Sequence, residues 1–499
     1  MGLNNVKIQK NFGKLKNWIG NKEVESKASQ YIDLFTPYTG EIIGEVPMGT
    51  AADVAEAVKS AKAAFKLWSN TNIKERVQVM FKLKTLMERD FEELKQLVSL
   101  ENGKTLAEAH GDVAKAIEVL EFGCSIPNKV YAPMLEVSNG IYCQVIKEPL
   151  GVVASIVPFN FPVMCPMWTI PIALTVGNTM VLKPSEQVPL GSMKLAKLLK
   201  EAGLPDGVLN VVHGGVDIVN GICDNADIRA VSFVGSTKVA KLVYGRAAMN
   251  GKRVLALGGA KNHLVLMPDA NLETAPMQIV DSAMGCAGQR CMAASLMLAV
   301  GDCQKHIDGM VAYAKSIKLG EKQGTVINKQ SVERINNYIT QAEKMGAKIL
   351  VDGRNAKPSN SDMSGLENGY WVGPTLLDNV SPDMPAGCEE IFGPVLSIVR
   401  VKTLEEALKI ENNNPYGNAA SIFTTNGANA QYLFRNANAG MNGVNVGVPV
   451  PREPFGFGGW NDSKFGNGDL TGDQGIDFWT QDRKITTKFI EPQTRNWMS

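Results

Sequence analysis

The stretch Val152-Val-Ala-Ser-Ile-Val157-Pro158-Phe-Asn-Phe-Pro162 decides the fold class of this chain. Its first six residues are nearly all apolar, which is typical of a strand buried on both faces, as in a parallel sheet. The strand runs into Asn160, an isolated amide between phenylalanines and prolines. In open α/β sheets, ligands bind beyond the carboxyl ends of the strands. Asn160 is therefore predicted to lie at a binding site.

The same pattern recurs along the chain. Helical periodicity separates the apolar runs, and strands alternating with helices predict a doubly wound parallel sheet. No GxGxxG follows any of the runs, so the common dinucleotide fingerprint is absent. A glycine and a serine at a helix start can still hold a phosphate through backbone N–H groups. The further runs are Thr179–Leu182 before Lys183-Pro-Ser-Glu186, Val208–Val212 before Gly214, and Ala230–Val234 before Gly235 and Ser236.

A second α/β unit is predicted over roughly Lys261 to Val444. Within it we interpret Asp269–Arg290 as a helix and Leu296–Val300 as the strand that follows. Outside it, Ile19–Pro47 is typical of a small hairpin, and Thr50-Ala-Ala-Asp53 has the form of a capping box that starts a helix.

The composition describes a folded chain with balanced charge. Its 499 residues carry 51 Lys and Arg against 50 Asp and Glu. This length predicts two or three domains, and the charge balance indicates neither a nucleic-acid nor a membrane partner. Eight scattered cysteines without CxxC or zinc-like spacing favour a reducing compartment and no metal site. With no apolar signal core before Lys16 and no run of membrane-spanning length, we expect a soluble cytoplasmic enzyme.

The stretch Gly285-Cys-Ala-Gly-Gln-Arg-Cys-Met-Ala293 is where we place the chemistry. Small residues around Cys291 let a substrate come close. The charge of the adjacent Arg290 favours the thiolate, which is the nucleophilic form. From the residues alone, two alternatives stay open: Cys291 as a buried inert thiol, and Cys286 as the nucleophile.

Six motifs in order resemble those of the aldehyde dehydrogenase superfamily. The resemblance covers the chain from about Lys16 to Ile490. Each motif is weak alone, whereas six in the family's order are highly specific. The motifs are Pro158-Phe-Asn-Phe-Pro162, Lys183-Pro-Ser-Glu186, Phe233-Val-Gly-Ser-Thr237, Gly288-Gln-Arg-Cys291, Glu390-Ile-Phe-Gly-Pro394 and Pro454-Phe-Gly-Phe-Gly-Gly459.

The resemblance implies a shortened Rossmann-type coenzyme domain, a second α/β catalytic domain and a small β oligomerisation arm. Cys291, as a thiolate, would attack the aldehyde carbon, and the Asn160 amide with the Cys291 backbone N–H would stabilise the oxyanion. Hydride transfer to NAD would leave a thioester. The coenzyme-binding residues implied are Pro158, Phe159, Lys183 and Glu186 (the last two at the adenosine ribose), Gly235 and Ser236 at the pyrophosphate, and Glu390 and Phe392 at the nicotinamide ribose.

One departure from the hydrolytic members changes the expected chemistry. Those members have Glu-Leu-Gly-Gly, whose glutamate activates the deacylating water, and this chain has Ala256-Leu-Gly-Gly259. Alanine cannot be a general base. Ala260-Lys-Asn-His263 and Val446-Gly-Val-Pro449 are similar to the methylmalonate-semialdehyde dehydrogenase branch, which passes the acyl group to coenzyme A. We expect coenzyme A as co-substrate; the alternative is a non-acylating dehydrogenase that releases the free acid.

The branch acts on malonate semialdehyde and its methyl derivative, which lose carbon dioxide during the cycle. Arg290 matches one of the branch's two carboxylate-binding arginines. Lys115 stands where the other would be, and it offers a point charge instead of a bidentate fork. Arg452 adds a cation to the loop before Phe457, and these four residues are the predicted substrate contacts. Another anionic aldehyde, including a phosphorylated or sulfonated one, stays open.

The resemblance also implies domain boundaries. The coenzyme-binding domain would comprise 1–134 and 151–260, interrupted by an oligomerisation hairpin at 135–150. The catalytic domain would cover 261–444, followed by a mouth loop that returns to the coenzyme domain over 445–483. Residues 484–499 would form an oligomerisation strand and tail. Proteins normally cover exposed sheet edges, so we expect a homodimer or homotetramer.

Overall fold

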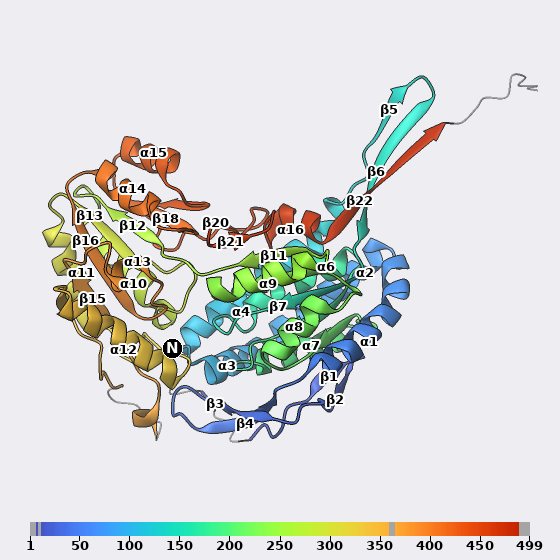
Figure 1. Cartoon of the computed structure of the whole chain (residues 1–499), viewed down its shortest axis with the longest axis horizontal. Helices are drawn as coiled ribbons and strands as arrows, with labels where there is room; N and C mark the ends of the chain where they lie inside the picture. The colour runs from blue at the N-terminus through green and yellow to red at the C-terminus, as the bar shows by residue number, and fades with distance from the viewer. Residues whose placement is uncertain (1–5, 8–10, 359–364, 489–499) are drawn as a thin grey trace, which may run out of the picture.

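The computed structural model describes residues 6–7, 11–358 and 365–488, and it has two large sheets and a projecting β arm (Figure 1). The chain begins with β1 (Asn17–Ile19) and β2 (Lys22–Val24). The expected hairpin follows as β3 (Tyr31–Phe35) and β4 (Ile42–Pro47). The predicted capping box is present at Thr50 and Asp53, and it opens helix α1 (Ala51–Asn70).

The first sheet has the strand order β2-β1-β9-β8-β7-β10-β11-β21, and its five central strands are parallel. These five are β7 (Val152–Ile156), β8 (Thr179–Lys183), β9 (Leu209–Val211), β10 (Ile228–Val234) and β11 (Arg253–Leu257). The edge strand β21 is Lys464–Phe465. The predicted doubly wound parallel sheet is confirmed.

Both faces of this sheet are covered by helices, as the apolar strands require. Alternate residues of β7 point to opposite faces: Val153 belongs to one apolar cluster, and Val152, Ala154 and Ile156 belong to another. The first cluster includes residues of α2 (Ile73–Arg89), α3 (Phe91–Asn102), α4 (Leu106–Ser125), α5 (Met164–Met167), α6 (Ile170–Thr175) and α7 (Leu190–Glu201). The second includes α1, α8 (Val216–Asp224) and α9 (Thr237–Met249).

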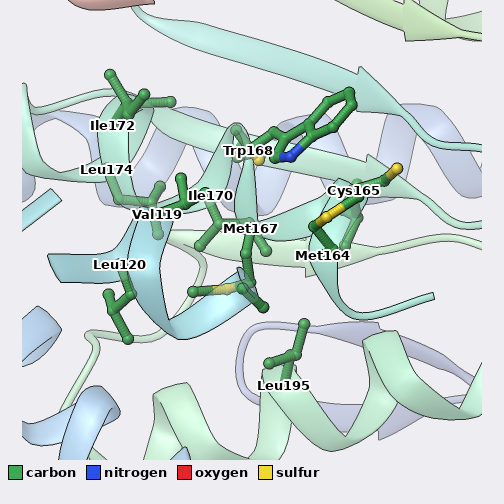
Figure 2. Close-up of a cluster of buried hydrophobic side chains, with 14 of the residues drawn as sticks. Val119, Leu120, Met164, Cys165, Met167, Trp168, Ile170, Ile172, Leu174 and Leu195 are labelled. Atoms are coloured by element: carbon green, nitrogen blue, oxygen red, sulfur yellow. The ribbon is translucent and has the colours of Figure 1, made fainter. Parts of the chain in front are cut away.

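Figure 2 shows part of the first cluster, in which side chains of α4, α5, α6 and α7 pack together. Val119 and Leu120 come from α4, and Leu195 comes from α7. Met164, Cys165 and Trp168, from the segment that follows Asn160, belong to the same cluster. The packing ties this segment firmly to the helical layer.

The second sheet has the order β14-β15-β16-β13-β12-β18-β19 and confirms the second α/β unit. Its strands are β12 (His263–Leu266), β13 (Leu296–Val300), β14 (Lys348–Val351), β15 (Thr375–Asp378), β16 (Val395–Val401), β18 (Ala419–Phe423) and β19 (Met441–Val444). Its helices are α10 (Ala275–Met284), α11 (Gln304–Ser316), α12 (Lys329–Lys344), α13 (Pro385–Cys388), α14 (Leu404–Asn412) and α15 (Gly427–Asn436). Two-residue strands β17 (Tyr416–Gly417) and β20 (Trp460–Asn461) and helix α16 (Gly472–Phe478) complete the C-terminal part.

The helix predicted over Asp269–Arg290 is wrong at both ends. It begins at Ala275 and ends at Met284, and a 3₁₀ turn over Gly285–Gly288 follows. Within this turn Cys286 and Ala287 have φ of 53° and 52°, a left-handed conformation that costs free energy for residues with a Cβ. The approach to Cys291 is therefore an irregular loop, not a helix.

The arm consists of β5 (Met134–Ser138), β6 (Ile141–Pro149) and β22 (Thr480–Lys488), and it projects from the body of the molecule (Figure 1). Of the oligomerisation strand and tail expected over residues 484–499, residues 484–488 lie in β22 and the rest are outside the described residues. Met134, Leu135 and Val137 on β5 are exposed. No helix of the described ranges is long and apolar enough to cross a membrane.

Candidate active site

One cavity of about 1310 Å³ lies at the carboxyl ends of β7, β8 and β10, where the sheet topology predicts a ligand. Its volume exceeds the roughly 300–1,000 Å³ of ordinary small-molecule pockets, which suits a dinucleotide together with a substrate. Most predicted site residues meet here. The predicted residues that line it are Pro158, Phe159, Asn160, Lys183, Glu186, Gly235, Ser236, Cys291, Glu390 and Phe392.

Cys291 follows the irregular turn, and its backbone is anchored by two amide side chains. Its carbonyl oxygen accepts hydrogen bonds from Nδ2 of Asn262 and Nδ2 of Asn418, both at 2.8 Å. Burial, together with the charge of the nearby Glu390, raises the pKa of the Cys291 thiol to about 12. Arg290 lowers this pKa, as we predicted, but burial and Glu390 outweigh it. The thiol is thus neutral in the free protein at pH 7.

The side chains of Arg290 and Cys286 contact each other, and neither lines the cavity. Nε of Arg290 lies 3.3 Å from Sγ of Cys286. The backbone N–H of Cys286 donates to Oε1 of Glu108 on α4 at 2.6 Å. This geometry favours Cys291 over Cys286 as the nucleophile, and it places Arg290 against the turn behind Cys291.

Asn160 presents its amide beside the Cys291 loop. Its Nδ2 donates to the carbonyl oxygen of Gln289 at 3.1 Å, which uses one of the two N–H bonds of the amide and fixes its orientation. Gln289 is itself held, because its Oε1 accepts from the backbone N–H of Ile327 at 3.0 Å. Among the residues that the structure describes, the second N–H of Asn160 has no hydrogen-bond partner, so it can donate to an oxygen of a substrate in the cavity.

The opposite part of the cavity has the features of a nucleotide site. Lys183 Nζ and Glu186 Oε2 are 2.9 Å apart, and although burial would raise the pKa of Glu186, Lys183 holds it below its usual value. Ser236 is the N-cap residue of α9 and makes no side-chain capping bond there. Free N–H groups at a helix start bind phosphate. The rings of Phe159 and Phe392 pack edge to face, and their centroids are 5.8 Å apart.

Glu390 is a half-buried residue that lines the cavity, and its charge acts on the thiol of Cys291. Its Oε1 accepts from the backbone N–H of Ala260 at 3.0 Å. Burial raises the pKa of Glu390 to about 7, although the charges of Lys261 and Arg334 oppose this. Its protonation state therefore changes in the physiological range.

Ala256 lies in β11 and is fully buried. It belongs to the apolar cluster that includes Phe233 of β10 and Ala240 of α9, and it does not line the cavity. Position 256 thus supplies no general base, and its side chain packs between the first sheet and α9.

The remaining predicted substrate residues are Lys115, Arg452 and Phe457. Lys115 on α4 pairs with Glu453 at 2.8 Å and with Glu118 at 3.1 Å, and Arg452 pairs with Glu118 at 2.9 Å. Phe457 is buried, and its ring lies 4.6 Å from that of Trp168, which lines the cavity. None of these three predicted residues lines the cavity itself.

Several residues of the site carry no signal in the sequence. Arg334 lines the cavity from α12 but has the spacing of an ordinary helix charge. Cys165 and Trp168 line it from the segment after Asn160, where they look like core residues. No group of His, Cys, Asp and Glu within the described ranges could hold a metal ion.

The profile of the aldehyde dehydrogenase family matches residues 24–485, so the chain belongs to that family. It is 44% identical over 483 residues to malonate-semialdehyde dehydrogenase 1 of Geobacillus thermodenitrificans, covering 95% of this chain and 99% of the relative. It is 45% identical over 484 residues to the human acylating, mitochondrial methylmalonate-semialdehyde/malonate-semialdehyde dehydrogenase, covering 96% and 90%. A structure from Sinorhizobium meliloti, assigned as a methylmalonate-semialdehyde dehydrogenase and complexed with NAD, has a TM-score of 0.93 and 42% identity, covering 96% and 99%.

Proposed function

We propose that the protein oxidises a short anionic semialdehyde, of the malonate or methylmalonate type, with NAD and passes the acyl group to coenzyme A. The observation that carries this proposal is the cavity that joins Cys291 and Asn160 to the α9 start and the Lys183–Glu186 pair. The names of the relatives support the substrate and the acylating reaction. NAD is supported by the NAD complex of the S. meliloti structure.

In this reaction Cys291, once deprotonated, attacks the aldehyde carbon to form a thiohemiacetal. The free N–H of Asn160 and the Cys291 backbone N–H would stabilise the oxyanion. NAD, when bound, supplies the acceptor for the hydride that leaves the former aldehyde carbon. Glu186 and Lys183 would hold the adenosine ribose, Gly235 and Ser236 the pyrophosphate, and Glu390 the nicotinamide ribose, with Pro158, Phe159 and Phe392 packed around it.

The acyl group then sits on Cys291 as a thioester. The thiolate of coenzyme A attacks its carbonyl carbon, and the Cys291 thiolate leaves. With a malonate-type substrate the bond to the carboxylate carbon breaks and carbon dioxide leaves, and the carbon that keeps the electron pair takes up a proton from solvent. Ala256 supplies no base for water, and a thiol ionises near neutral pH far more readily than water.

Arg290 and Lys115 are the proposed contacts for the substrate carboxylate, with Arg452 and Phe457 at the mouth. Arg290 lies behind the Cys291 loop, and it has no carboxylate within ion-pair distance among the described residues. Lys115 would have to share its charge with Glu453.

The second candidate is a non-acylating dehydrogenase that releases the free acid. Glu390 favours it, because its half-buried carboxyl, whose pKa is raised to about 7, lines the cavity and lies close enough to Cys291 to raise the pKa of the thiol. A carboxylate with such a pKa could activate water.

Rapid-quench measurements with NAD and malonate semialdehyde test the two candidates. NADH, free acid and acyl-CoA are followed together, with and without coenzyme A. We expect a burst of NADH, slow release of acid without coenzyme A, and rapid acyl-CoA formation with it. Fast steady turnover to free acid that coenzyme A does not change supports the second candidate.

We further propose the domain division given above and a homodimer or homotetramer joined through β5, β6 and β22. The exposed apolar residues of β5 support this assembly, since proteins normally cover such edges. The free state of all eight cysteines supports a reducing compartment such as the cytoplasm. Light scattering at micromolar concentration tests the assembly.

A further inference from the structure

Lys104 and Asp112 form an ion pair that is fully enclosed by protein. Nζ of Lys104 lies 2.8 Å from Oδ2 of Asp112, and their side chains are 1% and 0% exposed. The cost of taking two charges out of water is about as large as the gain from their mutual attraction, so a buried pair is weak evidence of a gain in stability. The position of this pair suggests another role.

The pair makes its remaining hydrogen bonds to the segment that carries Asn160. Nζ of Lys104 donates to the backbone carbonyl of Asn160 at 2.6 Å, and Oδ1 of Asp112 accepts from the backbone N–H of Met164 at 2.7 Å. Nζ also lies 3.8 Å from the ring centroid of Phe161. Both ends of the segment from Asn160 to Met164 are thereby bonded to one rigid pair of charges.

Helix α4, which carries Asp112, also contacts the loop of Cys291, whose backbone N–H is the second proposed oxyanion donor. Glu108 and Asp112 are four residues apart on α4 and lie on one face. Glu108 accepts the backbone N–H of Cys286, in the turn that leads to Cys291. Glu108 is fixed in turn by its capping-box bond from the backbone N–H of Thr105 at 2.9 Å. The first turns of α4 thus contact both the amide donor segment and the nucleophile loop.

We propose that Lys104 and Asp112 are positioning residues for the oxyanion donor: they hold the Asn160–Met164 segment so that the Asn160 amide faces the carbon attacked by Cys291. The inference rests on the proposed function, in which Asn160 donates to the oxyanion. Neither Lys104 nor Asp112 lines the cavity, so both act through the segment they hold. A displacement of about 1 Å at a reacting group can cost on the order of a hundredfold in rate.

The test variant replaces both charges, as Lys104→Met with Asp112→Asn, because either change alone leaves an unpaired buried charge. We expect kcat to fall by roughly ten- to a hundredfold, with little change in the KM for NAD. Alkylation of Cys291 by iodoacetamide should keep its wild-type rate, because it forms no oxyanion. Lys194→Met with Asp90→Asn is the matched control, since that 2.7 Å pair lies outside the residues lining the cavity.

A double-mutant cycle with Asn160→Ala decides whether the pair acts through Asn160. Asn160→Ala alone should lower kcat about 10²–10³-fold, the usual cost of losing one oxyanion donor. Adding the pair variant to it should lower kcat no further. A pair variant with wild-type kcat, or an equal further loss in the Asn160→Ala background, would overturn the inference while leaving the proposed function standing. A normal kcat for Asn160→Ala would instead remove the oxyanion role itself.

Discussion

Glu453 is predicted to weaken the binding of anionic aldehydes by occupying Lys115. The two side chains are 9% and 18% exposed and lie 2.8 Å apart, and Glu118 is the second partner of Lys115 at 3.1 Å. Exposed ion pairs are worth about 0.2–1 kcal/mol, and breaking a buried one costs about 3–5 kcal/mol. This pair is intermediate between those two cases, and Glu118 stays in place as a partner of Lys115. We therefore expect Glu453→Gln to improve the free energy of binding of a substrate carboxylate by about 1–1.4 kcal/mol, which is roughly five- to tenfold in affinity.

The assay is kcat/KM for malonate semialdehyde and for propanal, measured with wild type and Glu453→Gln. We expect kcat/KM for the semialdehyde to rise by the factor above and that for propanal to stay the same. The gain should shrink at high salt, because screening weakens the charge of Lys115. Glu92→Gln is the control, since Glu92 pairs with Lys95 elsewhere in the fold. A fall in kcat/KM for the semialdehyde, or an equal change for both aldehydes, would refute the competition between Glu453 and substrate.

Three further outcomes are expected. Cys291→Ala should abolish aldehyde-dependent NADH formation and keep NAD binding, whereas Cys286→Ala should retain activity. If Cys286→Ala is inactive and Cys291→Ala is active, Cys286 is the nucleophile. NAD should be preferred over NADP, because a 2′-phosphate would meet the carboxylate of Glu186, and equal catalytic efficiency with NADP contradicts this. The rate of Cys291 alkylation in the free protein should increase steadily from pH 7 to pH 10, since burial raises the thiol pKa to about 12. Deprotonation of Glu390 near pH 7 should work against that rise, and a plateau below pH 8 would mean that the thiolate is stabilised.

Local patterns in the sequence were enough for the central strands of the first sheet, the capping box at Thr50 and Asp53, and the residues at the strand ends. The apolar stretch Val152–Val157 predicts a doubly covered strand because both faces lose water on folding, and the structure has β7 there. Lys183 is the last residue of β8, and Gly235 and Ser236 directly follow β10. Residues that immediately follow parallel strands meet at one edge of the sheet, so their convergence in one cavity needs no knowledge of distant contacts.

Only the tertiary structure decided which charges are free and which are paired. Lys115 and Glu453 are 338 residues apart in sequence, and nothing local to either predicts their contact. Arg290 turns toward Cys286 because the chain leaves the helix at Met284, six residues earlier than its pattern predicts. Lys104 looks like a surface lysine until α4 and the Asn160 segment enclose it. Periodicity records which face of an element is apolar, whereas the partner of a buried charge is chosen by packing between segments far apart in the chain.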